Sequence, residues 1–151
     1  INNDKFLRIK LIFIEKKIQL NAFNEDDLKI FSYLCQDAII SKDEIYYDKT
    51  KKLFVATLSR YCWEKEELMK KGINFRVITG LQIKNVNQIE YINFKSKISF
   101  FNLLAITFNN KNIILNFSMS SKIKLDCDKI NATIEDIDIP WPTKLKPKHD
   151  Y

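Results

Sequence analysis

The chain has 151 residues, of which 46% are hydrophobic and 29% charged, the composition of one folded domain and not of a disordered segment. Its two glycines exclude a glycine-rich phosphate loop, and its single histidine, His149, argues against a histidine-based metal centre or catalytic triad. The net charge of +6 comes mainly from lysine, since only three of the 25 basic residues are arginine, so nucleic acid is a disfavoured partner.

The three cysteines, Cys35, Cys62 and Cys127, lie in apolar stretches and form no Cys-x-x-Cys pair. An odd number without that spacing predicts reduced, packed thiols, as in a cytoplasmic protein. The early apolar run Leu11–Ile14 is bounded by charged residues and is too short for a signal peptide or a membrane span. We therefore expect cytoplasmic localisation and no membrane association.

The sequence begins at Ile1 and has no methionine before Met69. We treat residues 1–17 as an N-terminal extension of doubtful nativeness, residues 18–143 as a single domain, and residues 144–151 as a polar tail. No internal repeat or linker divides the domain.

The first predicted elements are a short strand and a capped helix. Alternating apolar residues over Ile18–Ala22 indicate the strand. Asn24 is the expected N-cap, and the acidic residues 25–27 favour the positive end of the helix dipole. Apolar positions at helical spacing continue from Leu28 to Ala38, so one face of the helix is expected in the core.

After Ile40 the apolar residues alternate, which predicts strands. A charged turn at residues 48–52 separates the runs Ile45–Tyr47 and Leu53–Trp63, so these two are expected to form a hairpin. Residues 64–71 are expected to be a loop or a helical turn.

Further strands are predicted along the second half of the chain. One runs from Ile73 to Ile83 with a bulge or bend at Gly80, and another covers residues 89–94. Three alternating runs follow between residues 98 and 127, in which Asn102 interrupts the pattern as a bulge or a buried amide.

The last predicted element is a short closing helix. The spacing relaxes to Ile130, Ile134 and Ile137, and residues 140–142, which include two prolines, would end a helix. The expected fold is therefore α+β: a curved antiparallel sheet or partial barrel of about 6–7 strands, packed on the N-terminal helix and this C-terminal helix. A pleckstrin-homology-like barrel is one version of it.

The densest cluster of polar and aromatic residues is the stretch from Arg60 to Glu64. As a ligand site, it would present Arg60, Glu64 and Trp63 to an anionic or planar molecule; as a structural cluster, Arg60 would pair with a carboxylate while Trp63 covers the core. Gln36 and Asp37 follow the helix, where a negative charge is unfavourable and needs a compensating partner such as Arg60 or Arg76, or a function.

No residue is assigned a catalytic role, and no cofactor is expected. The acidic residues between positions 126 and 138 are dense enough to suggest a metal, but they do not form a calcium loop, so no metal site is predicted.

Ordered motifs along the chain resemble the family called domain of unknown function 2948. They are Ile18-Gln19-Leu20, Asn24 to Leu28, Leu34-x-Gln36-Asp37-Ala38, Arg60-x-x-Trp63-Glu64, Gly72-x-x-Phe75, Leu103 to Ile106, Ile123-x-Leu125-Asp126, Ile130-x-Ala132, Asp136, Trp141-x-Thr143 and Pro147-x-His149-Asp150. The resemblance implies a small cytoplasmic protein of alphaproteobacteria and supplies no catalytic residues. Cys62 departs from the acidic residue that the family tends to have there.

Three functions compete at this point. The first is a non-enzymatic binding or adaptor module for a protein or a small molecule, acting as a monomer or small homo-oligomer. The second is a small enzyme using Arg60 and carboxylates, with His149 as acid or base, which requires Arg60, Trp63, Glu64 and His149 to converge on one concave pocket. The third is weak nucleic-acid binding, which requires the lysines to cluster on one face.

Overall fold

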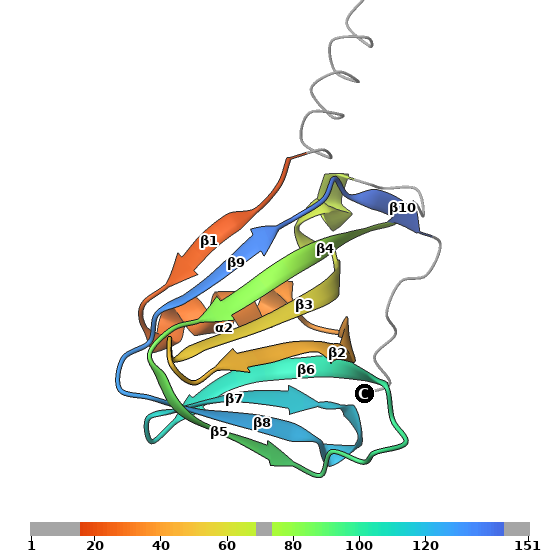
Figure 1. The fold of residues 1–151 in the computed structure, drawn as a ribbon. Coiled ribbons are helices and arrows are strands. Elements are labelled where there is room, and N and C mark those ends of the chain that lie inside the picture. Colours follow the sequence, from red (N-terminus) through yellow and green to blue (C-terminus); the bar gives the residue numbers. More distant parts are fainter. Residues whose placement is uncertain (1–15, 69–73, 144–151) are drawn as a thin grey trace, which may run out of the picture.

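The computed structural model describes residues 16–68 and 74–143 (Figure 1). The helices in these ranges are α2 (Glu25–Leu34) and the short 3₁₀ helices η1 (Trp63–Leu68) and η2 (Ser118–Ser120). The first five strands are β1 (Gln19–Ala22), β2 (Ala38–Asp48), β3 (Leu53–Tyr61), β4 (Asn74–Ile83) and β5 (Val86–Ile92). The other five are β6 (Phe100–Asn109), β7 (Asn112–Phe117), β8 (Lys122–Cys127), β9 (Ala132–Asp136) and β10 (Trp141–Thr143).

All ten strands belong to one antiparallel sheet. Nine of them follow the order β1-β9-β4-β3-β2-β6-β7-β8-β5, and β10 pairs with β4 beside the end of β9. The predicted α+β class and the curved antiparallel sheet are confirmed. The strand number was underestimated, because β9 lies where the closing helix was expected and β10 includes residues that were expected to end that helix.

The sheet folds over because β4 runs directly into β5. The connection has only two residues, Lys84 and Asn85, yet these strands lie far apart in the sheet order. Asn85 takes a positive φ of 60°, a conformation that Asn tolerates better than most residues. The N–H of Val86 donates to the carbonyl of Lys52 at 2.9 Å, which fastens the corner to the β2–β3 turn.

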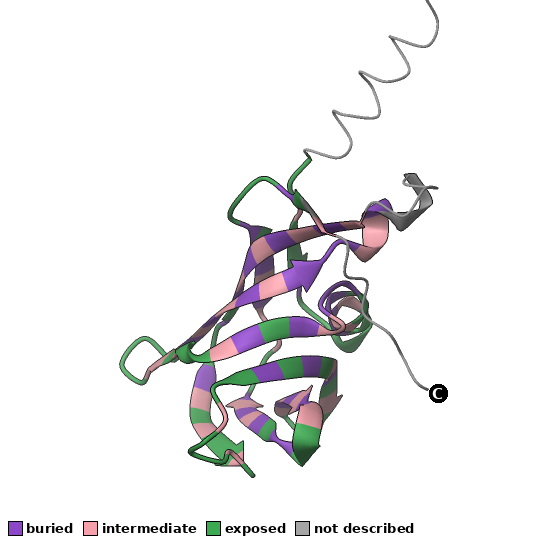
Figure 2. Ribbon diagram, turned by 90° about the vertical axis from the view of Figure 1, so that its right-hand side faces the viewer, coloured by how far each residue is buried: buried purple, intermediate pink, exposed green. Residues whose placement is uncertain are grey.

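Helix α2 covers the interior of the folded sheet. Its N-cap is Asn24, as predicted, whose side-chain oxygen accepts from the N–H of Asp27 at 2.8 Å. Leu28, Phe31 and Leu34 are buried in the main core, which also takes residues from strands on both halves of the sheet. Figure 2 shows buried residues alternating with more exposed ones along the strands, the period of two expected of a sheet with one covered face.

The predicted closing helix is wrong, since Ala132–Asp136 is strand β9 and Trp141–Thr143 is strand β10. The inward positions of β9 are Ala132, Ile134 and Asp136, all buried. A small residue and a buried carboxylate hide the period of two, so only the wider isoleucine spacing is visible in the sequence.

Two local predictions also differ from the structure. Gly80 pairs with Thr57 and Glu135 in continuous register, without a bulge, and the side chain of Ile137 lies over it. The irregularity of β6 falls between Leu103 and Ala105. Asn102 is exposed, and its backbone N–H donates to the hydroxyl oxygen of Ser118 at 3.2 Å.

Candidate functional site

Arg60 lies on the inner face of the sheet near the end of β3, with no exposed surface. Its guanidinium donates to both carboxylate oxygens of Glu64 at 2.8 and 3.0 Å, and to both of Asp136 at 3.1 and 3.0 Å. It also donates to the Thr79 hydroxyl at 3.3 Å and the Tyr61 carbonyl at 3.4 Å. All three guanidinium nitrogens are therefore engaged inside the chain.

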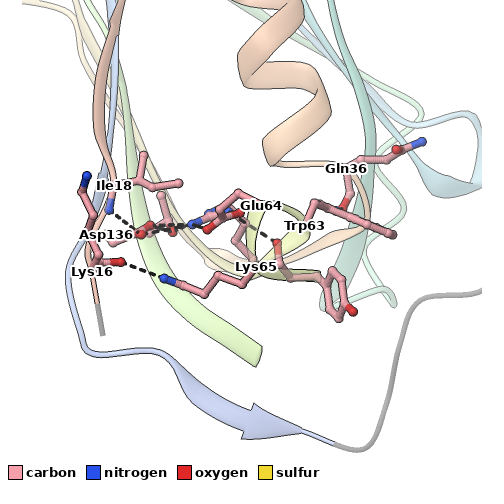
Figure 3. A network of polar contacts seen from close by, with 10 residues as sticks. Lys16, Ile18, Gln36, Trp63, Glu64, Lys65 and Asp136 are labelled. Carbon is pink, nitrogen blue, oxygen red and sulfur yellow. Dashed lines mark hydrogen bonds and ion pairs between the residues drawn. The ribbon is translucent and has the colours of Figure 1, made fainter. Parts of the chain in front are cut away.

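Asp136 is the second centre of this network, and its side chain is also fully buried. Besides Arg60, it accepts from the Thr79 hydroxyl at 2.7 Å and from the N–H of Ile18 at 2.8 Å (Figure 3). The ammonium of Lys65 donates to the carbonyl of Lys16 at 2.8 Å nearby. The network thus joins β3, β4, β9 and η1 to the segment that enters β1.

The cluster contains two cations, Arg60 and Lys65, and two carboxylates, Glu64 and Asp136. Burial lowers the pKa of Arg60, but the hydrogen bonds and charge of Glu64, together with the charge of Asp136, more than offset burial and raise that pKa. Arg60 stays positively charged between two carboxylates, and its hydrogen bonds hold the side chains of Glu64 and Asp136 in place. It corresponds to the structural alternative for this stretch, in which Arg60 pairs with a carboxylate.

Trp63 and Gln36 meet at the side of the cluster (Figure 3). The indole N–H of Trp63 donates to the backbone carbonyl of Gln36 at 2.9 Å, and its ring lies 4.5 Å from that of Tyr61 in an edge-on arrangement. The contact joins η1 to the residue that follows the end of α2. Trp63 is half-buried and lies against the buried ring of Tyr61, an arrangement that fits the structural alternative.

Asp37 takes a positive φ of 62° after the helix, and its N–H donates to the carbonyl of Leu103 at 2.7 Å. Burial lowers the pKa of Arg76, and the charge of Asp37 opposes that shift. Arg60 and Arg76 were the two arginines expected to compensate Asp37, and the charge of Asp37 acts on Arg76. His149 lies outside the described residues, so its convergence with Arg60 is a prediction only.

The three cysteines are buried free thiols, which confirms the packing predicted for them. Burial raises the pKa of both Cys35 and Cys62 to about 12, against the opposing charge of Arg60. Burial likewise raises the pKa of Cys127 to about 12. Thiols with such pKa values stay protonated at neutral pH and are poor nucleophiles.

A groove that the sequence did not indicate lies between β2 and the end of β5. It is a hollow of about 410 Å³ lined by Lys42 and Ile45 from β2 and by Tyr91 and Phe94 from β5 and the loop after it. Phe94 packs against Phe101 with ring centroids 4.7 Å apart, so the floor of the groove is continuous with the core. Burial raises the pKa of Tyr91, whose phenol therefore stays protonated as a hydrogen-bond donor.

A second hollow, of about 330 Å³, lies on the outer face of β5, β7 and β8 and is polar. Charges of both signs line it, because Glu90 and Asp126 alternate with Lys111 and Lys124. Such a surface has no net preference for one class of ligand.

Within residues 16–68 and 74–143, His, Cys, Asp and Glu side chains form no group of three that could hold a metal ion. Of the helices in those ranges, none has the length and apolar character that crossing a membrane requires.

The fold and these sites define a small α+β protein built on one curved antiparallel sheet. The chain belongs to the family described as protein of unknown function DUF2948, whose profile matches residues 18–149. No curated protein and no solved structure matches the chain. The expected family is thereby confirmed, while the likeness to a pleckstrin-homology barrel stays a prediction.

Proposed function

We propose that the protein is a non-enzymatic binding module whose binding surface is the groove between β2 and β5. The observation that carries the proposal is the groove itself: apolar and aromatic side chains line it, with Lys42 as the charged residue at its rim. Binding sites in proteins have this character, largely apolar with a few polar groups that fix orientation.

The Arg60 cluster supports this choice by elimination. An enzyme using Arg60 and Glu64 needs those groups to reach a substrate, yet Arg60 has no exposed surface and donates to Glu64 and Asp136 instead. Releasing Arg60 would leave a buried carboxylate without its cation, which costs several kcal/mol. The buried thiols, with pKa values of about 12, add no nucleophile at neutral pH.

The proposal includes a reducing, cytoplasmic setting, because all three cysteines are free and buried. Nucleic acid is the less favoured partner, since recognition of single strands needs several cations beside stacking aromatic residues. Lys42 alone among the groove's lining residues is basic.

The test is a titration with the anionic naphthalene dye ANS, which combines a planar apolar body with a charge that suits Lys42. The wild-type chain should enhance ANS fluorescence, and Ile45→Asp and Tyr91→Ala should each weaken binding about tenfold. Ile30→Asp, on the exposed face of α2, is the matched control and should bind as wild type.

Circular dichroism and urea unfolding must show that all variants are folded, since ANS also binds loosened chains. A folded wild-type chain that does not bind ANS, or equal binding by wild type, Ile45→Asp and Ile30→Asp, would contradict the proposed groove.

A further inference from the structure

The strands β1 and β5 end the nine-strand order, and these two edge strands differ in how well they are protected. β1 is an edge of only four residues, and α2 packs beside it. β5 is an edge of seven residues that pairs with β8 alone. Proteins usually shield such edges, because an unpaired strand edge offers hydrogen bonds to any extended chain.

The register shows which backbone groups of β5 face the groove. The N–H of Cys127 donates to the carbonyl of Lys111, so Cys127 points its backbone groups toward β7. Because successive residues of a strand point to opposite sides, Asp126 and Lys124 point theirs toward β5, where they oppose Gln88 and Glu90. Ile89 and Tyr91 therefore direct their N–H and C=O groups away from β8, and within the described residues no hydrogen bond reaches these four groups.

The opposite wall of the groove is the part of β2 where its regular pairing with β6 and β3 is interrupted. The N–H of Lys42 makes the last backbone bond toward the β6 side, to the carbonyl of Ser99 at 2.8 Å. Pairing with β3 is irregular between Ile40 and Ile45. In the same region β2 thus lines the hollow with Lys42 and Ile45.

One end of the gap between β2 and β5 is closed. The Tyr47 hydroxyl donates to the carbonyl of Val86 at 2.7 Å, which holds the start of β5 to the end of β2. The gap opens from there toward Tyr91 and Phe94, where the hollow lies. An extended chain would therefore enter from the Phe94 end.

Charged side chains and prolines are the usual protections of an edge strand, and neither faces the groove on β5. The charged residue of the strand, Glu90, lines the outer polar hollow, whereas Ile89 packs against the core and Tyr91 lines the groove. The strand contains no proline. Unpaired backbone groups beside an apolar hollow are the features that strand addition uses, the backbone for affinity and the hollow for one side chain.

We propose that the edge of β5 binds an extended peptide segment of a partner protein as an added strand. The segment hydrogen-bonds to the backbone of Ile89 and Tyr91, places an apolar side chain in the hollow, and sets a carboxylate beside Lys42. This inference rests on the proposed binding function and names the class of partner for the same groove.

The experiment is selection of random linear nonapeptides displayed on phage against the full chain, followed by affinity measurement with the enriched peptide. Methylation of single backbone nitrogens in that peptide should weaken binding at least about tenfold at alternate positions, because only every second N–H faces β5. Lys42→Glu should weaken an acidic peptide by a similar factor, and Lys29→Glu, on the exposed face of α2, should leave its affinity unchanged.

Three results would overturn the inference. They are the absence of any enriched peptide, an enriched peptide whose affinity is insensitive to backbone methylation, and a dimer in solution that protects the amides of Ile89 and Tyr91 before peptide is added. If ANS still binds at the groove in any of these cases, the proposed binding function survives while the peptide partner does not.

Discussion

At the scale of single residues, Arg60 and Asp136 form a pair that the fold depends on. Both side chains have no exposed surface, and each satisfies the charge of the other through two hydrogen bonds. A buried pair of this kind adds little compared with apolar residues, but losing one member leaves a charge unpaired in the core. Removing either Arg60 or Asp136 should therefore lower the free energy of unfolding, because the partner that is left stays charged and buried.

Replacing Arg60 by methionine tests this view. Arg60→Met should lower the free energy of unfolding by about 3–5 kcal/mol, because the carboxylate of Asp136 stays buried without its cation. Glu64→Gln should cost less, about 1–3 kcal/mol, because Glu64 is partly exposed and Asp136 keeps its partner. Urea unfolding measures the free energy of unfolding of both variants. If Arg60→Met does not fold, the comparison of Glu64→Gln with wild type can still be made.

Lys29→Met is the matched control, since the pair of Lys29 with Asp26 spans 3.7 Å between exposed side chains. An Arg60→Met variant that loses no more stability than Lys29→Met would show that the buried pair does not hold the fold.

The buried thiols give the protein a predictable response to alkaline pH. Burial raises their pKa values to about 12 in the folded chain from the ordinary thiol value of 9.0, so between these limits the unfolded chain releases protons that the folded chain retains. Their contribution to stability is complete below pH 9 and is lost as the pH rises toward 12, by about 1.4 kcal/mol per pH unit for each thiol.

Urea unfolding at several pH values, compared between wild type and Cys35→Ala, isolates one thiol from other titrating groups. The difference in unfolding free energy between the two chains should stay constant below pH 9 and shrink above it. A difference that is independent of pH up to 11 would mean that Cys35 titrates normally in the folded chain.

At the scale of elements, α2 begins where its cap predicts. Asn24→Ala removes the acceptor for the N–H of Asp27 and should destabilise the chain by about 1 kcal/mol, measured by urea unfolding. Asn102→Ala is the control, because Asn102 is exposed and the hydrogen bond found for it uses its backbone N–H. Equal effects of the two substitutions would mean that the cap contributes nothing specific.

The elements that the sequence predicted correctly are those with unbroken apolar patterns. Helix α2 has a cap, an acidic first turn and one apolar face, and the β2–β3 hairpin has a charged turn between alternating runs. Strand β9 was missed because Ala132 and Asp136 occupy inward positions, where the pattern requires large apolar residues. Asp136 is buried because Arg60 pairs with it, a contact between residues 76 positions apart that no local pattern contains.

The candidate sites show the same division. The stretch from Arg60 to Glu64 could be found because its polar and aromatic residues are neighbours in the sequence. The groove could not, since Lys42 and Ile45 meet Tyr91 and Phe94 only after the sheet folds over at the β4–β5 corner. Where a sheet bends is a tertiary property that an alternating pattern leaves open.

At the scale of the whole molecule, the sheet is secured at one end and open at one edge. Arg60, Asp136, Glu64 and Lys65 join strands and connecting segments at the secured end. Tyr47 holds the start of β5 near β2. Beyond that hydrogen bond, the groove side of β5 is the surface on which the account of binding depends.

Amide hydrogen exchange of the free, full chain measured by NMR tests this most directly. The amides of Gln88, Glu90 and Ile92, which are bonded to β8, should exchange slowly, while those of Ile89 and Tyr91 in the same strand should exchange at least about tenfold faster. Uniformly slow exchange along residues 88–92 would mean that another part of the chain, or a second copy, already pairs with this edge, and would contradict an open binding groove.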